Sequence, residues 1–283
     1  MTYITAAFLG LVQGIAEFLP ISSSGHLSLL QNFMNLTDVE HDHIFFDVLL
    51  HFGTLIAVCI VYRKDIIDMI REFFLGIGSV VSRKGDRLAP PPPARRMVFM
   101  IIIATLPLFI VLPIQDAVES LYNNTIFISC ALIVTGFLLY FSDRMARGRK
   151  TAKNATVVDA VIVGCAQALA TVPGLSRSGT TISVGMARGF DRNFAVRFSF
   201  LMSLPAVLGA NILSLIDAIQ EGFNTELLPM YLVGVLVATV SGYFAIRLVK
   251  LSAHKGKFGN FAYYCWIVGA ISLIYSIVRF AMV

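Results

Sequence analysis

The fold is decided by the stretch QGIAEFLPISSSGH, residues 13–26, which interrupts an apolar block that runs over residues 4–34. Pro20 lacks the backbone N–H group that a helix interior needs, and the Ser-Ser-Ser-Gly turn after it can cap a new helix. Neither half of the block is long enough to cross a bilayer, which takes about 20 apolar residues. We therefore predict a re-entrant helical hairpin that enters and leaves the membrane on one side.

A second stretch, PGLSRSGTT at residues 173–181, interrupts the apolar block 157–188 in the same way. The two blocks share residues at a constant offset of 154, so that Gly10, Gln13, Ser22, Ser24 and Gly25 fall on Gly164, Gln167, Ser176, Ser178 and Gly179. These identities involve small, common residues, and they gain weight because three long apolar blocks follow each interrupted block. The pattern predicts two related halves.

The composition indicates an integral membrane protein. Of the 283 residues, 57% are apolar and only 14% are charged, whereas a soluble domain carries about 25% charged residues. This excludes an ordinary soluble enzyme, a disordered regulator and a secreted disulfide scaffold. Six uninterrupted blocks are long enough to span a bilayer, at residues 44–62, 97–116, 125–141, 194–216, 229–250 and 260–280.

The charges between these blocks predict the orientation. Lys and Arg are concentrated in residues 63–96, 144–153, 188–197 and 247–257, while residues 1–62, 115–124 and 217–228 contain none. The positive-inside rule places the four basic connections in the cytoplasm. The net charge of +5 is thus a topology signal rather than a nucleic-acid footprint. With six crossings, the first hairpin enters from outside and the second from inside, which is typical of an inverted-topology repeat.

The predicted fold class is therefore an all-α integral membrane protein that forms a single membrane domain over residues 1–283. Residues 1–145 form the first repeat, with its re-entrant hairpin at 4–34. Residues 155–283 form the second, inverted repeat, with its hairpin at 157–188. Each half contains one hairpin and three transmembrane helices.

Ionisable residues inside the interrupted blocks are the candidates for chemistry, because charge within a membrane is costly unless it is used. Glu17 and Gln13 are four residues apart and share one helix face. Arg177 lies in the second interruption, where its planar fork suits bidentate contact with a phosphate. Together with His26 and two serine-capped helix N-termini, these residues suit a phosphorylated substrate. The alternatives are serines that only cap turns and an arginine that only satisfies loop carbonyls or pairs with Glu17.

Weaker candidates lie between the two blocks. Asp47 and His51 share a helix face and would support the site, with helix capping or an inter-helix hydrogen bond as an equal alternative. His41 and His43 lie among acidic residues in an outside connection, where a solvated charged turn is favoured over a metal cluster.

The two motifs resemble the signature regions of the undecaprenyl-diphosphate phosphatases of the bacitracin-resistance type, and the similarity extends over the whole chain. The resemblance implies hydrolysis of undecaprenyl diphosphate to undecaprenyl phosphate, which recycles the lipid carrier of peptidoglycan synthesis. It also implies a multi-pass protein of the bacterial cytoplasmic (inner) membrane, with an active site that opens to the outer face. The implied divalent cation, Mg²⁺ or Ca²⁺, would be held by Glu17 and Gln13. Many members have a glutamate at the position of Gln13, which leaves Glu17 as the only carboxylate of the pair.

The resemblance also assigns roles by matching position. Glu17, Ser23, His26 and Arg177 are the expected catalytic residues. The expected phosphate-binding residues are Ser22, Ser24, Gln167, Ser176, Ser178, Gly179 and Thr181. The resemblance leaves three candidates for the nucleophile: His26, Ser23 and water. A direct role for His26 is preferred.

The expected partners are the polyprenyl diphosphate substrate and the membrane, with no nucleic acid, and a homodimer is left open. The alternative function is a transporter or flippase of polyprenyl phosphate or another anion, because inverted repeats with broken helices are common in transporters. A histidine beside a hydroxyl favours hydrolysis, since binding alone does not require one.

The charge pattern makes a testable prediction about topology. In a cysteine-free background, single cysteines at Asn123 and Lys84 should label oppositely with a membrane-impermeant thiol reagent in intact cells, because the first lies in a connection without basic residues and the second in the most basic one. Only the cysteine at Asn123 should react from outside. Labelling of Lys84→Cys from outside would contradict the inverted arrangement.

Overall fold

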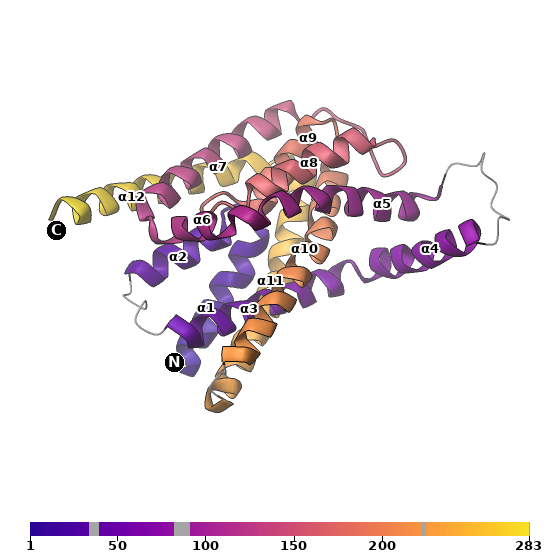
Figure 1. The fold of residues 1–283 in the computed structure, drawn as a ribbon. Helices are drawn as coiled ribbons and strands as arrows, with labels where there is room; N and C mark the ends of the chain where they lie inside the picture. Colours follow the sequence, from indigo (N-terminus) through magenta and orange to yellow (C-terminus); the bar gives the residue numbers. More distant parts are fainter. Residues whose placement is uncertain (34–39, 82–90, 222–224, 283) are drawn as a thin grey trace.

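The computed structural model describes residues 1–33, 40–81, 91–221 and 225–282 (Figure 1). Within these ranges every regular element is a helix, and the one β-type contact is an isolated bridge between Lys150 and Phe190. The α-helices are α1 Tyr3–Phe18, α2 Ser23–Phe33, α3 Glu40–Val61, α4 Arg63–Val81, α5 Pro93–Thr105, α6 Gln115–Ser120, α7 Thr125–Met145, α8 Val157–Leu169, α9 Arg177–Ala187, α10 Arg192–Glu221, α11 Leu228–His254 and α12 Phe261–Met282. The all-α class is confirmed.

Both apolar blocks are interrupted where the sequence predicts. In the first block α1 ends at Phe18 and α2 begins at Ser23. Ser22 lies between them with a φ of 70°, a left-handed conformation that is uncommon for a residue other than glycine. In the second block α8 ends at Leu169 and α9 begins at Arg177. Proline, glycine and serine therefore divide each block into two helices of 11 to 16 residues.

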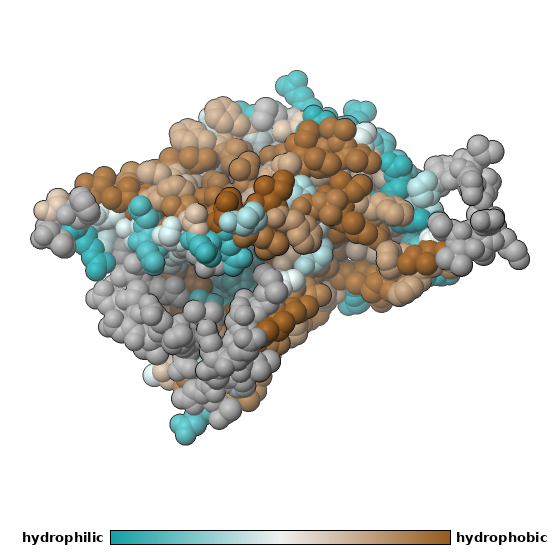
Figure 2. Space-filling model, viewed as in Figure 1, coloured by the Kyte–Doolittle hydropathy of each residue, from teal (hydrophilic) through white to brown (hydrophobic). Residues whose placement is uncertain are grey.

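Several helices are suited to a bilayer. Among the described residues, four helical stretches are long and apolar enough to cross it: Pro93–Val118, Thr125–Arg144, Leu228–His254 and Phe258–Arg279. Helices α3 and α4 form a pair bent by 83°, which would provide a fifth. Large apolar side chains are exposed, including Leu232, Leu236 and Phe244 of α11 and Ile271 of α12. Hydrophobic residues also gather on the face of the molecule that Figure 2 shows. Such extensive exposed apolar surface indicates contact with lipid, so the chain is a multi-pass membrane protein.

The stretch 97–116 differs from the single continuous helix that its hydropathy suggests. Helix α5 ends at Thr105, and two 3-10 helices follow at Leu106–Ile110 and Leu112–Ile114. Each 3-10 helix has a proline in its first two positions, Pro107 and Pro113. Because proline cannot donate the hydrogen bond of an α-helix interior, the chain tightens at these positions instead of continuing as an α-helix.

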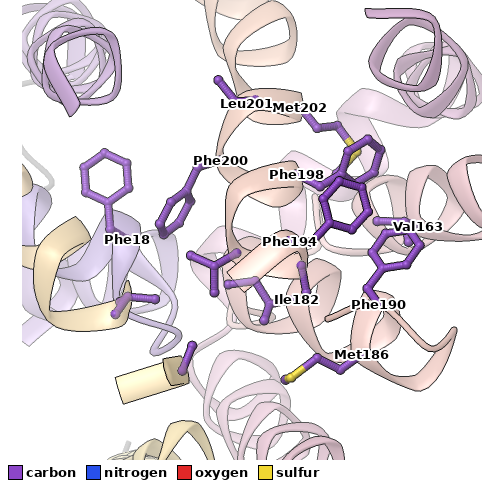
Figure 3. Close-up of a cluster of buried hydrophobic side chains, with 14 of the residues drawn as sticks. Phe18, Val163, Ile182, Met186, Phe190, Phe194, Phe198, Phe200, Leu201 and Met202 are labelled. Atoms are coloured by element: carbon purple, nitrogen blue, oxygen red, sulfur yellow. The ribbon is translucent and has the colours of Figure 1, made fainter. Parts of the chain in front are cut away.

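A cluster of aromatic side chains joins the first block to the second (Figure 3). Phe18, at the end of α1, packs edge-on against Phe200 of α10, with ring centroids 5.5 Å apart and planes at 83°. Nearer the start of α10, Phe194 and Phe198 pack against Phe190, which follows α9. This packing fixes the end of α1 relative to α9 and α10, and so positions the polar residues next to Phe18.

Close approach of α1 and α11 depends on glycine. A Cβ atom added to Gly10 would collide with the backbone carbonyl of Gly234, and one added to Gly14 would lie 2.5 Å from the carbonyl oxygen of Ala238. At both positions the added Cβ atom would lie closer to the carbonyl oxygen than van der Waals contact allows. Only glycine therefore allows the two backbones to pack at this separation. Gly14 lies one turn before Phe18 and therefore helps to set the position of the whole interruption.

Gly14→Ala should destabilise the protein, because its new methyl group meets backbone atoms of α11 that cannot move independently. Overpacking of this kind typically costs about 1–3 kcal/mol, and we expect a lower melting temperature in detergent. The matched control is Gly209→Ala in α10, since a Cβ at Gly209 meets no atom within 4 Å. If Gly14→Ala had the same melting temperature as Gly209→Ala, the α1–α11 contact would tolerate a side chain, which contradicts this account.

Candidate active site

The Glu17 carboxylate connects the two interruptions. It is buried in the last turn of α1, where one oxygen, Oε2, accepts hydrogen bonds from Gln13 Nε2 at 3.1 Å and Ser23 Oγ at 2.7 Å. The other oxygen, Oε1, accepts from Arg177 Nη2 and forms an ion pair with it. Arg177 is the first residue of α9 and its side chain is partly exposed. The predicted carboxylate and the predicted arginine therefore belong to one site.

The backbones of the two interruptions also touch. Ser178 Oγ donates to the backbone carbonyl of Leu19 over 3.4 Å. A Cβ added to Gly25 would lie 3.1 Å from Cα of Gly174. These contacts place the N-terminal ends of α2 and α9 next to each other, although the residues that form them are about 150 positions apart in the sequence.

Serines cap both of these helix ends. Ser22 Oγ accepts from the backbone N–H of Gly25 at 3.2 Å, and Ser176 Oγ accepts from that of Gly179 at 3.1 Å. The remaining N–H groups of a first helical turn have no partner within the helix and carry partial positive charge. Two such ends beside a guanidinium group form a suitable environment for a phosphate. Ser22, Ser24, Ser176, Ser178 and Gly179 all lie at these two ends.

The His26 imidazole is held at both nitrogens. Its Nδ1 lies 2.8 Å from the backbone carbonyl oxygen of Ser22. A carbonyl can only accept, so Nδ1 carries the proton and Nε2 of the neutral ring has the free lone pair. Nε2 lies 2.9 Å from the hydroxyl of Tyr264, and the two rings stack with centroids 5.6 Å apart and planes at 13°. In this tautomer Nε2 accepts a hydrogen bond from the Tyr264 hydroxyl.

Three further predicted residues, Gln167, Thr181 and Ser23, have the following surroundings in the structure. Gln167 is buried in α8, and both polar atoms of its amide have no hydrogen-bond partner within the described part of the chain. Thr181 donates to the backbone carbonyl of Arg177 at 2.8 Å and contacts Ser199 at 2.6 Å, so it supports the start of α9. Ser23 is bound to Glu17 rather than to His26. An arrangement in which His26 activates Ser23 is not the one present.

Sequence reasoning missed two residues at this site. Tyr264 of α12 holds His26 although 238 positions separate them, and no local pattern marks it. Thr135 of α7 holds the second interruption, because its hydroxyl donates to the carbonyl of Gly174 and accepts from the backbone N–H of Ser176. A buried threonine in an apolar helix was the only available signal. Nε2 of His51, a weaker candidate in the sequence, lies 3.8 Å from Oε2 of Glu17, so His51 also lies at this site.

Known proteins with similar sequences share one description. The family described as "Bacitracin resistance protein BacA" matches residues 6–271. A protein of Alkaliphilus metalliredigens named undecaprenyl-diphosphatase is 42% identical over 279 residues, which cover 98% of this chain and all of the relative. Proteins of the same name from Methanobrevibacter smithii and Halothermothrix orenii are 41% and 40% identical. They cover 98% and 94% of this chain, and 99% and 95% of their own lengths.

Tyr264→Phe should make His26 more reactive toward diethyl pyrocarbonate, because the phenylalanine ring keeps the stacking but no longer occupies the lone pair of Nε2. Mass spectrometry of the peptide that contains His26 should show several-fold faster modification. Tyr263→Phe is the matched control, since Tyr263 is exposed and packs against Trp266. Equal modification rates in the parent and both variants would contradict the hydrogen bond.

Proposed function

The chain belongs to the BacA bacitracin resistance family, and we propose that it is an integral membrane phosphatase that hydrolyses undecaprenyl diphosphate. The products are undecaprenyl phosphate and inorganic phosphate, so the reaction recycles the lipid carrier used in cell-wall synthesis. The observation that carries this proposal is the position of Arg177, which is partly exposed beside Glu17 and between two serine-capped helix ends. An anionic headgroup attached to a lipid chain can reach such a site from the bilayer.

Arg177 is proposed to bind the terminal phosphate. Its guanidinium group is neutralised by Glu17, while part of its side chain is exposed. A bound phosphate would use the exposed N–H groups of the guanidinium fork together with the backbone N–H groups at the start of α2 and α9. These donors are already held in place, and they would stabilise the charge that develops on the phosphate oxygens in the transition state.

His26 is proposed to attack the terminal phosphorus through Nε2, the nitrogen that carries the lone pair. The bond between that phosphorus and the bridging oxygen breaks, and undecaprenyl phosphate leaves with the bridging oxygen. Water then displaces the phosphoryl group from the imidazole and releases inorganic phosphate. Tyr264 must first give up its hydrogen bond to Nε2, so its hydroxyl controls when the nucleophile is free.

A divalent cation, Mg²⁺ or Ca²⁺, is part of the proposal, and the residues around Glu17 fit one. Glu17 Oε2 and Ser23 Oγ are adjacent oxygens. Gln13 Oε1 is buried and has no hydrogen-bond partner within the described residues. Oxygen ligands of this kind suit either ion. When bound, the cation would neutralise negative charge on the diphosphate.

We also propose the inverted-topology repeat, with six spans and two re-entrant hairpins. Corresponding residues of the two halves make corresponding hydrogen bonds. The hydroxyls of Ser22 and Ser24 are 3.4 Å apart, and those of Ser176 and Ser178 are 3.3 Å apart. The packing partners correspond as well, because α1 packs on α11 as α8 packs on α5. The sixth span, residues 194–216, would be the middle of α10.

The orientation and location are proposed from the charges. The basic connections would lie in the cytoplasm, so the first hairpin, which carries Glu17 and His26, would enter from the outer face of the bacterial cytoplasmic membrane. A site at the meeting point of the two hairpins would then open to the outside.

Arg177→Lys tests the proposed function and the role of the arginine together. The substitution keeps the charge and removes the bidentate fork, so the variant should melt within a few degrees of the parent and release phosphate at least about tenfold more slowly. The measurement is release of inorganic phosphate from undecaprenyl diphosphate by protein purified in detergent. Arg247→Lys, at an exposed arginine of α11, is the matched control.

Two outcomes would contradict this proposal. Absence of phosphate release by the parent protein would favour a transporter, because transport needs two compartments and hydrolysis does not. Normal hydrolysis by an unstable Arg177→Lys protein would assign Arg177 to the scaffold.

A further inference from the structure

Helices α3 and α4 meet at a corner. Their axes are bent by 83° at Tyr62, which lies between the end of α3 at Val61 and the start of α4 at Arg63. A helix that leaves a spanning helix at nearly a right angle runs along the membrane surface rather than through the bilayer. Because residues 44–62 are a proposed span and the most basic connection follows them, the corner would lie at the cytoplasmic surface.

The side chains of α4 agree with this position. Asp65 forms an ion pair with Arg197 of α10, and Glu72 forms one with Arg95 of α5. Large apolar side chains are exposed along another face of α4: Ile67, Ile70, Phe74 and Ile77. A helix with one apolar face and one charged face lies in the interface between headgroups and acyl chains.

An apolar groove follows α3 to this corner. Its volume of about 450 Å³ is within the range of sites for small molecules, about 300–1,000 Å³. It is lined by one face of α3 and by the first residue of α4: Phe52, Leu55, Ile56, Cys59, Ile60 and Arg63. Because only the last of these is charged, the groove suits a hydrocarbon chain with a polar group at the end next to α4.

The length of the groove corresponds to one leaflet of a bilayer. An α-helix rises about 1.5 Å per residue, so the stretch from Phe52 to the end of α3 at Val61 is about 14 Å long. The hydrocarbon core of a bilayer is about 30 Å thick, which gives about 15 Å for each leaflet. The acyl chains of phospholipids fill one leaflet, whereas the undecaprenyl chain of the proposed substrate is too long for the groove.

Positive charge lies at the end of the groove next to α4. Arg63 and Lys64 are exposed, and neither forms an ion pair with a described residue. The adjacent acid, Asp65, is already paired with Arg197. Asp68 is exposed one turn after Lys64 and can compensate at most one of the two charges. Basic residues beside an apolar groove at the cytoplasmic surface are typical of sites for anionic lipid headgroups.

We propose that the corner of α3 and α4 binds an anionic glycerophospholipid of the cytoplasmic leaflet. One acyl chain lies in the groove along α3, and the phosphate contacts Arg63, whose planar fork suits bidentate contact. Arg63 lies about three helical turns beyond His51, the residue of α3 next to Glu17, so this site is separate from the candidate active site. The bound lipid is a ligand that holds α4 at the membrane surface, and it goes beyond the proposed function.

Native mass spectrometry of the full-length protein in detergent tests the headgroup. Phosphatidylglycerol and phosphatidylcholine with identical acyl chains are added at equal concentration. The parent should bind phosphatidylglycerol at least about fivefold more strongly, because one basic residue near an anionic headgroup contributes about that factor. Arg63→Gln should remove most of this preference and melt within a few degrees of the parent. Lys257→Gln, at an exposed lysine between α11 and α12, is the matched control and should keep the preference.

Cys59 reports on the groove itself in the unaltered chain. Its thiol is exposed and lines the groove, whereas Cys130 is exposed on α7. Phosphatidylglycerol should slow the reaction of Cys59 with N-ethylmaleimide several-fold and leave that of Cys130 unchanged, as measured by mass spectrometry of the two peptides. Phosphatidylcholine should protect Cys59 less.

Three results would overturn the proposal. The first is equal protection of Cys59 by the two phospholipids. The second is undiminished protection by phosphatidylglycerol in folded Arg63→Gln. The third is stronger protection by undecaprenyl phosphate than by phosphatidylglycerol, which would assign the groove to a prenyl chain. None of these measurements uses phosphate release, so their outcome is independent of the proposed function.

Discussion

The structure depends on the ion pair between Glu17 and Arg177. A carboxylate and a guanidinium group within a membrane protein are each costly unless they are paired. Here the partners come from two separate interruptions, and neither interruption contains its own opposite charge. The two helix breaks must therefore meet for either charge to be tolerated. That requirement places two helix N-termini, a cluster of serines and one histidine around the same point, and the proposed function uses this arrangement to bind a phosphate.

The surrounding helices keep this meeting point in position. Phe18 anchors the end of α1 in the aromatic cluster of α10, and Gly14 allows α1 to lie directly against α11. Thr135 of α7 ties down the second interruption. Apolar packing thus provides the rigidity, while the polar groups at the breaks stay available for a ligand. A substrate phosphate would use the exposed N–H groups of Arg177, while Glu17 holds the guanidinium group in position.

The sequence predicted those features that local chemistry determines. Both helix breaks were predictable from proline, glycine and serine, and Glu17 and Arg177 stood out because charge is rare in apolar blocks. The prolines that convert part of the stretch 97–116 into 3-10 helix were visible, but hydropathy alone does not register them. The hydrogen bond from Tyr264 to His26 was not predictable, because it joins α2 to α12 through tertiary packing. For His51 the helix face was predictable, whereas its proximity to Glu17 required the packing of α3 against α1.

The central claim is that Glu17 and Arg177 act as one unit at the junction of the two interruptions. A double-mutant cycle on phosphate release tests it most directly, with Glu17→Gln, Arg177→Gln and the double variant measured against the parent. Residues that act as a unit are strongly non-additive. The account predicts that the double variant is about as slow as the slower single variant. Independent effects, with the two losses of rate multiplied in the double variant, would contradict it.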